Sequence, residues 1–573
     1  MQPSWVISTN LARCRDCYRC VRACPVKAVR IKEGQAQVVP ELCIACGNCV
    51  WVCPQKAKLV RDDRPELKEV LLTGRPVVAT VAPSFPAYFN INSFLPMEKA
   101  LKGLGFQAAE ETAIGAQMVG TAHKTLVDQT PGKWPIITSS CPAVVNFIEK
   151  YYPDLIFHLA PIVSPMIAHG RWLRRRYGPE VYIVFIGPCI AKKDEMKDAS
   201  VARVIDGALT FAELREWLEE KGIHLPKEED HPEQEESSMA RLFPIEGGLV
   251  GTAAMDTDRL ASRVVTATGI EACQDVLRSM RQGRLRANLV ELMACEGGCI
   301  NGPVMRGQES AFLARQKVMD YARYNPARVL PDSEEWPDLG RSFEDESVPI
   351  PEFTEEQIRR VLELVEKYAP EDELNCNACG YPTCRDKAIA TLRGMAEATM
   401  CIPYMRRRAE TIRQVVMDVT PDAILIVDKN LDIQDLSPSA EKMFRCHLPS
   451  MLGQPLSRMV PETEGFAQVR DTGNPIFSRT IHLREDLIVK ETIVPVKDQR
   501  LLMGILRDVT EREQQRQELE RIRNETLNRT QEVIRNQMQV AQEIAQLLGE
   551  STAETKMMLT RLAKLLKEGQ GEG

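Results

Sequence analysis

Apolar and polar positions follow a different rhythm in each part of the chain. From about Val77 onward, short apolar runs alternate with amphipathic segments. The runs Val77–Val81, Trp134–Thr138 and Val181–Ile186 predict buried strands, and the spacing of Ala208–Gly222 predicts a helix. Strands that alternate with helices indicate an α/β core.

The C-terminal half has other patterns. Residues 332–356 are rich in Pro, Asp and Glu and predict a linker, and a helical spacing follows up to Tyr368. Residues 409–510 show short strands and turns, and helix-forming sequence begins at Glu511. Because Gly549 interrupts this last stretch, we expect a long helix and a short one that can pair.

Length and charge restrict the function classes. A chain of 573 residues predicts three to five domains, and 73 basic against 80 acidic residues give a net charge of −7. This balance argues against a nucleic-acid-binding protein, which would show a basic face. No apolar run approaches the ~20 residues that span a membrane, and the N-terminus shows no signal peptide. We therefore expect a cytoplasmic protein.

The 18 cysteines change this picture most. In a chain without a secretion signal, metal or redox chemistry explains so many cysteines better than disulfides do. Eight lie between Cys14 and Cys53, four lie between Cys376 and Cys401, and four more are dispersed between these groups.

The N-terminal sixty residues contain a duplicated motif with the spacing C-x2-C-x2-C-x3-C-P. This spacing is the signature of two-cluster ferredoxins, in which the fourth cysteine of each run binds the other cluster. It predicts one [4Fe–4S] cluster on Cys14, Cys17, Cys20 and Cys53 and a second on Cys43, Cys46, Cys49 and Cys24. A pair of zinc sites is the alternative, but zinc ligands usually occur as separated pairs.

A second cysteine group has the spacing C-x2-C-x4-C and a later fourth member. Its residues are Cys376, Cys379, Cys384 and Cys401. The segment around the first three resembles a small Fe–S domain of redox complexes and sensors, which implies a third [4Fe–4S] cluster. A zinc site with four cysteine ligands is the alternative.

The dispersed cysteines occur in three short segments. These read TSSCP at 138–142, PCIAKKDE at 188–195 and ELMACEGGCING at 291–302. Each cysteine follows a predicted strand or lies in a glycine-rich turn, where the backbone can approach a bulky ligand. Buried structural cysteines would explain one of them but not all, so we expect Cys141, Cys189, Cys295 and Cys299 to bind one cluster.

Residues 77–330 resemble the [FeFe]-hydrogenases. The three segments resemble the signatures of that family's H-cluster, and FPIEGG at 243–248 resembles its Gly-Gly element. The resemblance implies that the four dispersed cysteines hold a [4Fe–4S] cluster. It also implies that Cys299 bridges to a diiron unit with CO, CN⁻ and azadithiolate, and that Lys192 donates a hydrogen bond to a cyanide. The implied reaction is reversible splitting of H2 into protons and electrons.

The chain departs from this family at proton-transfer positions. Catalytic members have a relay cysteine where this chain has Ser140, whose hydroxyl is far less acidic than a thiol of pKa about 8.5. The family's methionine before Pro188 is replaced by Gly187, whereas Met293 is retained. The stretch 113–127, where relay carboxylates are expected, contains none. Retained cluster ligands without relay residues favour a sensor over a fast enzyme.

The region after the cysteines supports a sensor. Residues 409–510 resemble a PAS domain, with DAILIVD at 422–428 and MGILRDVT at 503–510. None of the seven histidines lies in the C-terminal helices, so these helices cannot act alone as a histidine kinase. We expect them to dimerise or to bind a separate kinase, phosphatase or regulator. The order of these parts resembles the sensory type of [FeFe]-hydrogenase.

The sequence thus predicts a multidomain α/β and α+β protein. We expect a two-cluster ferredoxin domain at 1–60, an [FeFe]-hydrogenase-type α/β domain at 75–345, a small 4Fe–4S domain at 355–405, a PAS domain at 409–510 and C-terminal helices at 511–573. Three functions stay open. The first is an H2 or redox sensor with slow turnover, the second a ferredoxin-linked hydrogenase, and the third an Fe–S redox sensor without the diiron unit.

Overall fold

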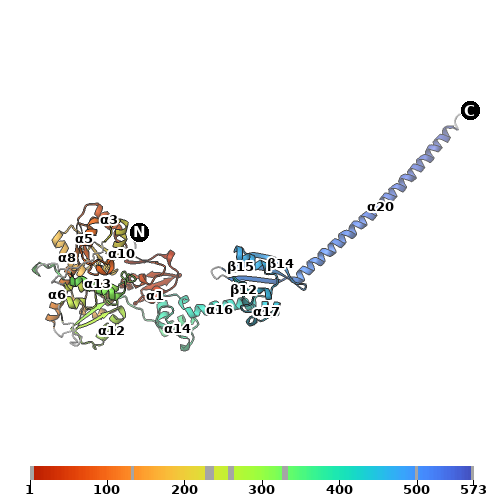
Figure 1. Ribbon diagram of the computed structural model, residues 1–573. Helices are drawn as coiled ribbons and strands as arrows, with labels where there is room; N and C mark the ends of the chain where they lie inside the picture. The colour runs from red at the N-terminus through yellow and green to blue at the C-terminus, as the bar shows by residue number, and fades with distance from the viewer. Residues whose placement is uncertain are drawn as a thin grey trace. The chain divides into compact units, whose positions relative to one another are not determined.

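The computed structural model describes residues 5–130, 135–225, 238–253, 255, 264–324, 333–496 and 501–568. The chain divides into two compact units, Met1–Met405 and Arg406–Gly573, which are described separately. The first unit contains all the cysteine groups that the sequence singles out, and the second contains the predicted PAS region (Figure 1).

The duplicated N-terminal motif folds as two similar halves. Short antiparallel pairs frame it: β1 (Ile7–Thr9) with β4 (Lys58–Val60), and β2 (Val29–Lys32) with β3 (Gln35–Val38). Each half has one short helix, α1 (Arg19–Ala23) or α2 (Asn48–Trp51).

The residue before each of these helices has a left-handed backbone, Tyr18 in the first half and Gly47 in the second. Only the second position also demands glycine for space, because a Cβ there would lie 2.7 Å from Ile190. The second half is therefore packed closely against the segment that contains Cys189 and Lys192.

The centre of the first unit contains two parallel sheets. One has the strand order β6-β5-β8-β9, and the other has the order β10-β11-β7. Their bounds are β5 Val77–Val81, β6 Ala108–Glu111, β7 Ile136–Ile137, β8 Tyr182–Gly187, β9 Gly207–Thr210, β10 Val264–Thr268 and β11 Leu289–Met293. The strands predicted at 77–81 and 181–186 are confirmed, and the third predicted strand is reduced to β7, with Trp134 outside the described residues.

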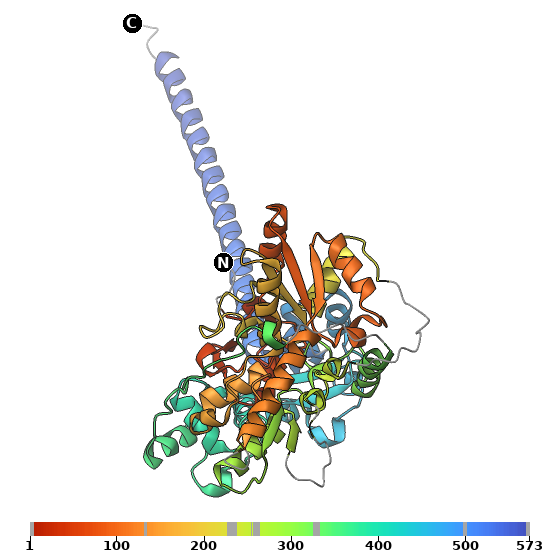
Figure 2. The same ribbon diagram turned by 90° about the vertical axis from the view of Figure 1, so that its left-hand side faces the viewer.

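Helices pack around these strands (Figure 2). They are α3 Arg64–Leu72, α4 Phe85–Phe89, α5 Leu95–Gly103, α6 Ala113–Gln129, α7 Pro142–Tyr151, α8 Pro165–Tyr177, α9 Lys192–Glu195, α10 Phe211–Glu220, α11 Gly248–Thr252, α12 Ile270–Arg281 and α13 Ala311–Tyr324. The helix expected from residue 208 begins only at Phe211, because residues 207–210 pair with β8 and Thr210 caps the helix.

The stretch predicted as a linker is not free of the domain. Leu339 accepts a backbone hydrogen bond from Val163, Gly340 bridges Ile162, and the Arg341 side chain is buried. We name residues 338–346 the packed segment. The composition was a poor guide here because a few buried side chains fix a stretch that is otherwise polar. The chain then enters α14 (Glu355–Glu363) and α15 (Cys384–Leu392).

The second unit contains a five-stranded antiparallel sheet with the order β13-β12-β16-β15-β14. The strands are β12 Ala423–Asp428, β13 Ile433–Leu436, β14 Ile476–Arg484, β15 Leu487–Val496 and β16 Leu501–Asp508. Helices α17 (Pro438–Phe444), α18 (Leu448–Met451) and α19 (Glu464–Thr472) lie between β13 and β14, and α16 (Ile402–Val419) precedes β12.

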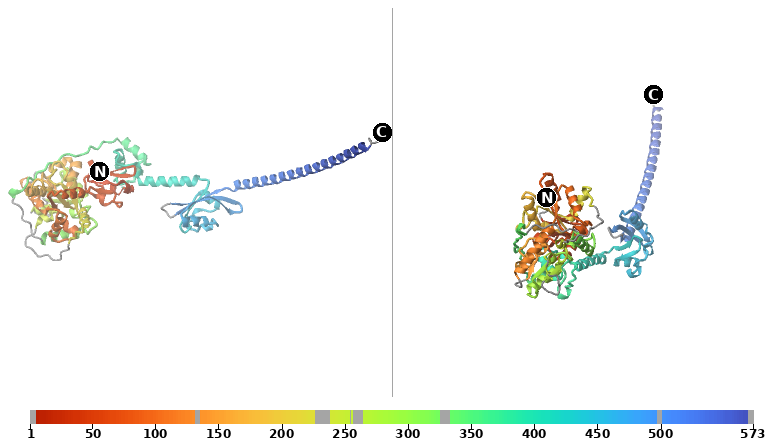
Figure 3. Two further views of the ribbon diagram at one scale, coloured as in Figure 1. Left: turned by 90° about the horizontal axis from the view of Figure 1, so that it is seen from above. Right: turned by 60° about the vertical axis from the view of Figure 1, so that its left-hand side comes forward.

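The prediction of two C-terminal helices is wrong. A single helix, α20 (Thr510–Glu568), follows β16 and continues through Gly549 without a break (Figure 3). One glycine costs only about 1 kcal/mol relative to alanine, and the good helix formers on both sides outweigh that cost. No helix in the described parts of the chain is long and apolar enough to cross a membrane.

A buried carboxyl group in α7 makes stability depend on pH. Burial raises the pKa of Glu149 from 4.5 to about 7, although the N–H of Glu344 and the charge of Arg341 oppose the rise. Between about pH 4.5 and 7 the unfolded chain loses this proton and the folded protein keeps it, so stability falls as pH rises. We expect Glu149→Gln to remove this fall.

The measurement is the thermal midpoint at pH 5 and at pH 8. From the lower to the higher pH, the wild type should lose about 5–10 °C more than Glu149→Gln, which corresponds to about 2–3 kcal/mol in a domain of this size. The exposed Glu344 provides a control, and Glu344→Gln should keep the wild-type pH dependence. Equal pH dependence in Glu149→Gln and the wild type would contradict the assignment.

Candidate functional site

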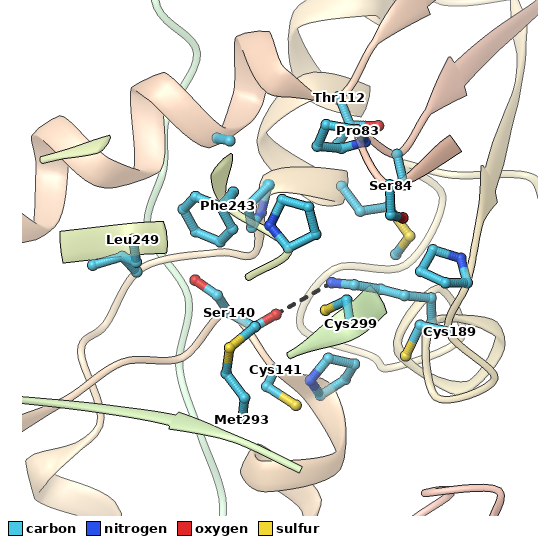
Figure 4. A pocket seen from close by; sticks show the side chains of 18 of the residues that line it. Pro83, Ser84, Thr112, Ser140, Cys141, Cys189, Phe243, Leu249, Met293 and Cys299 are labelled. Carbon is cyan, nitrogen blue, oxygen red and sulfur yellow. Dashed lines mark hydrogen bonds between the residues drawn. The ribbon is translucent and has the colours of Figure 1, made fainter. Parts of the chain in front are cut away.

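A cavity of about 100 Å³ lies at the carboxyl ends of strands from both parallel sheets (Figure 4). We name it the cysteine pocket. Parallel strands of α/β proteins place ligand-binding residues at this edge. Residues from five strand ends line the cavity: Pro83 and Ser84 after β5, Thr112 after β6, Ser140 and Cys141 after β7, Cys189 after β8, and Cys299 after β11.

The structure brings the four dispersed cysteines together. Cys141, Cys189 and Cys299 line the pocket, and Cys295 lies close enough to them that their charges contribute to its raised pKa. A Cβ at Gly302 would lie 3.4 Å from the Cys295 Sγ. The expectation that these residues converge from three loops agrees with this arrangement.

The chemistry of these thiols suits an iron cluster. Burial and the charge of Cys141 raise the pKa of Cys189 to about 11, although Lys192 and backbone N–H groups oppose the rise. Burial and the other thiols raise the pKa of Cys295 and Cys299 as well. Several thiolates are therefore unfavourable here unless a cationic centre compensates their charge. Among the described residues, no three Cys, His, Asp or Glu side chains are placed to hold a single metal ion.

Lys192 reaches the pocket from the first turn of α9. Its Nζ donates hydrogen bonds to the Glu195 carboxylate at 2.6 Å and to the Ser140 carbonyl at 3.4 Å. Arg341 of the packed segment donates to the other oxygen of Glu195 at 3.0 Å and to Asp198 at 2.6 Å. Glu195 thus holds Lys192 in place and is itself bound by Arg341, which lies far away in the sequence.

Other polar groups of the pocket have few partners. The Ser140 Oγ is buried and makes no hydrogen bond within the described protein, and Met293 lines the same cavity. Glu291 also lines it, and sequence reasoning missed this residue. Burial raises the pKa of Glu291 to about 7, although it accepts hydrogen bonds from backbone N–H groups of α11. The sequence signal that could have identified Glu291 is a carboxylate within the otherwise apolar run that forms β11.

The cysteines of the duplicated motif lie in equivalent places in its two halves. Cys24 accepts a hydrogen bond from the N–H of Ala28 at 3.2 Å, and Cys53 accepts one from Ala57 at 3.2 Å. Hydrogen bonds to sulfur are among the contacts that tune Fe–S clusters. The second half also approaches the pocket, because the charge of Cys46 contributes to the raised pKa of Cys295.

The third cysteine group surrounds its own cavity. Cys376, Cys379, Cys384 and Cys401 all line it, together with the buried Lys387. This group packs on the duplicated motif: Arg22 donates to the Ala378 carbonyl at 3.0 Å, and a Cβ at Gly380 would lie 3.0 Å from the Arg22 nitrogen. The duplicated motif therefore lies next to both the cysteine pocket and the third cysteine group, although the three are far apart in the sequence.

Comparisons with known families agree with this organisation. The iron-only hydrogenase large subunit, C-terminal domain, matches residues 75–303, and a 4Fe–4S dicluster domain matches residues 6–54. A family of small Fe–S cluster domains matches residues 372–403, and the PAS fold matches residues 417–514.

Individual relatives include hydrogenases and other proteins. The periplasmic [Fe] hydrogenase large subunit of Nitratidesulfovibrio vulgaris is 29% identical over 52% of this chain and 87% of its own length. Iron hydrogenase 1 of Clostridium pasteurianum is 25% identical over 42% of this chain and 50% of its own. A probable cytosolic Fe–S cluster assembly factor of Caenorhabditis elegans is 24% identical over 35% and 55%.

The matches explain the arrangement of the parts. Two cysteine-rich Fe–S regions accompany a pocket at the strand ends of a hydrogenase-type domain, and the antiparallel sheet of the second unit is a PAS domain. The chain is therefore similar to the [FeFe]-hydrogenases over residues 75–303, and it combines this hydrogenase-like region with Fe–S regions and a PAS domain.

Proposed function

We propose that this protein senses H2 or redox state at an H-cluster of slow turnover and passes the signal to its PAS domain. The observation that carries the proposal is the composition of the cysteine pocket. The four cysteines and Lys192 are present, while a serine occupies the family's proton-relay position at Ser140. The residues that would bind the cluster are retained, whereas the residue for rapid proton transfer is not. This combination suits a receptor more than a fast enzyme.

The proposed cluster ligands are those that the sequence predicts. We assign Cys141, Cys189, Cys295 and Cys299 to the cubane of the H-cluster, and Cys299 would also hold the diiron unit. When bound, the diiron unit, with its CO, CN⁻ and azadithiolate ligands, supplies the centre at which H2 is reversibly split. Lys192, Met293 and Ser140 line the cavity. Lys192 would donate a hydrogen bond to a cyanide, Met293 would supply an apolar contact, and Ser140 would supply a hydroxyl group.

The cysteine-lined regions form the proposed electron route. Cys46 lies near Cys295, and the contact of Arg22 with Ala378 joins the duplicated motif to the third cysteine group. Electrons from H2 would therefore reach a third [4Fe–4S] cluster at Cys376–Cys401, next to α16. A charge change there that favours one conformation by a few kcal/mol is enough for a switch.

The output is proposed to involve another protein. Helix α20 exposes apolar side chains at helical spacing, which suits pairing with a second copy of the chain. A separate kinase, phosphatase or regulator would then respond to the PAS domain. We place this system in the cytoplasm, because free thiols in this number suit a reducing compartment.

The decisive experiment is an infrared spectrum of anaerobic, cofactor-loaded protein with and without H2. We expect CO and CN⁻ bands that shift under H2. Absent bands, in protein whose other clusters are intact and under conditions that load a known hydrogenase, would leave an Fe–S redox sensor without the diiron unit. The similarity to an Fe–S assembly factor favours that second candidate.

Ser140→Cys tests whether slow turnover follows from the relay position. A thiol at this position is a much better proton donor and acceptor than the serine hydroxyl. We expect H2 production with a chemical reductant to rise by roughly 10²-fold, the low end of the effect of a positioned acid–base group. Fast wild-type turnover with little change in the variant would favour a ferredoxin-linked hydrogenase instead.

A further inference from the structure

A buried chain of polar side chains begins at the wall of the cysteine pocket. Thr112 lines the pocket (Figure 4). Its hydroxyl lies 2.7 Å from that of Thr80. The Thr80 hydroxyl also lies 2.8 Å from Nδ1 of His169, which projects from α8. Thr80 and His169 are completely buried. Two hydroxyls and an imidazole are therefore joined in a continuous row that leads away from the pocket.

The row continues to the protein surface. Nε2 of His169 lies 3.6 Å from the Glu110 carboxylate, and neither of these two facing atoms has another hydrogen-bond partner within the described protein. The other oxygen of Glu110 accepts a hydrogen bond from Tyr177 at 2.8 Å and pairs with Arg176 at 3.2 Å. The Arg176 side chain is 54% exposed, so the buried Glu110 end of the row lies directly beneath a solvent-exposed side chain.

A second polar chain also leaves the pocket, through Lys192, Glu195 and Arg341. It cannot conduct protons, because an arginine guanidinium does not release its proton in proteins. Every member of the first row can both accept and release a proton. The stretch of α6 where the family's relay carboxylates are expected has no carboxylate, so this row supplies a different route from a different strand and helix.

We propose that Thr112, Thr80, His169 and Glu110 conduct protons between the cysteine pocket and solvent. This inference rests on the proposed function. Splitting one H2 releases two protons and two electrons, and the electrons leave separately through the Fe–S clusters. Each proton that Thr112 accepts displaces one to Thr80, then one to His169, to Glu110 and finally to water, so every member carries the same number of protons before and after. The hydroxyls and the imidazole tautomer must then reset before the next transfer.

The charges around Glu110 suit a slow conductor. Burial alone would raise the pKa of Glu110, but His169, Tyr177 and Arg176 together lower it to about 2. Glu110 therefore stays ionised at neutral pH. A proton crosses Glu110 against the preference of this carboxylate, which limits the rate without closing the route. Such a conductor is adequate for a receptor that exchanges few protons.

Two substitutions at Thr80 test the row in the full, cofactor-loaded chain. Thr80→Val removes the hydroxyl at constant volume, and Thr80→Ser keeps it. We expect exchange between H2 and D2O to slow at least about 10-fold in Thr80→Val and to recover in Thr80→Ser, with unchanged CO and CN⁻ bands in both. The equally buried His123 lies outside the row, so His123→Gln should exchange at the wild-type rate.

A second readout needs no turnover. The chain has only seven histidines, so selective ¹⁵N labelling resolves the His169 imidazole in protein without the diiron unit. Its Nδ1 signal should shift in Thr80→Val and return in Thr80→Ser. Wild-type exchange rates in Thr80→Val, or an unchanged His169 signal, would overturn the proposal and leave the H2 sensor standing. If the wild type showed no CO and CN⁻ bands, both the proton row and the proposed H2 sensor would be refuted.

Discussion

Cys299→Ala is expected to abolish the CO and CN⁻ bands and every response to H2, while the other Fe–S clusters stay loaded. Cys299 lines the cysteine pocket together with Lys192, and it is the residue that we assign to both halves of the H-cluster. Burial and the charges of Cys189 and Cys141 raise the pKa of its thiol, so the thiolate requires a bound metal centre. Alanine offers no ligand and leaves the diiron unit without its protein bridge.

The measurement combines infrared spectra under H2 with the iron content of the purified protein. Bands should be absent and H2-dependent reduction should fall below detection, at least about 10²-fold under the wild type. Iron in the duplicated motif and in the third cysteine group should be unchanged. Cys273 is a buried cysteine outside the pocket whose thiol contacts the Met293 carbonyl, so Cys273→Ala is the matched control. Bands that still shift under H2 in Cys299→Ala would refute the assignment.

A redox response that survives in Cys299→Ala has a separate meaning. The third cysteine group would then sense electrons from a source other than H2, and the protein would be an Fe–S sensor without a functioning diiron unit. A response that disappears together with the bands supports the H2 sensor. The same variant thus separates the two candidate functions.

The cysteines were predictable because ligand spacing within a short segment is a local property. The duplicated motif and the three dispersed segments specify loops that can surround a cluster, whatever the rest of the chain does. Their convergence was also inferable, because residues that follow parallel strands meet at one edge of the sheet. The edge between two sheets at which Cys141, Cys189 and Cys299 meet follows from strand order, which the sequence does not display.

The residues that reasoning from sequence missed depend on distant partners. Glu291 looks like one polar residue in a strand, and its importance arises only where β11 ends at the pocket. His169 and Thr80 lie 89 positions apart and become neighbours only after α8 packs on β5. The helix break predicted at Gly549 was wrong for a related reason. The cost of one glycine is local, and it is outweighed by the many helix-forming residues on both sides of it.

Arg341 presents the clearest case of such long-range dependence, and its removal should have the second large effect. Arg341 lies in a stretch whose composition predicts a linker, yet its side chain is only 2% exposed and pairs with Glu195, which is fully buried. Removing one partner of a buried ion pair leaves a charge poorly compensated and typically costs about 3–5 kcal/mol. We expect Arg341→Ala to lower the free energy of unfolding of the first unit by about that amount.

The same variant should change the pocket. Glu195 accepts hydrogen bonds from both Arg341 and Lys192, so the loss of Arg341 frees Glu195 to move and to take the lysine with it. In loaded protein we expect shifted CN⁻ bands, because Lys192 is the proposed cyanide donor. Arg341→Lys retains the charge but not the planar fork that binds Glu195 and Asp198 together, so it should recover stability only in part.

Arg171 supplies the control that makes this test specific. It donates hydrogen bonds to the backbone carbonyls of Asp338 and Gly340 and so holds the same packed segment, but neither of these bonds involves Glu195. Arg171→Ala should therefore lower stability by less and leave the CN⁻ bands in place. If Arg341→Ala and Arg171→Ala behaved alike in denaturant unfolding and in the infrared, Arg341 would anchor the segment and nothing more. If the two variants differ only in the CN⁻ bands, the packed segment acts on Lys192 through Arg341.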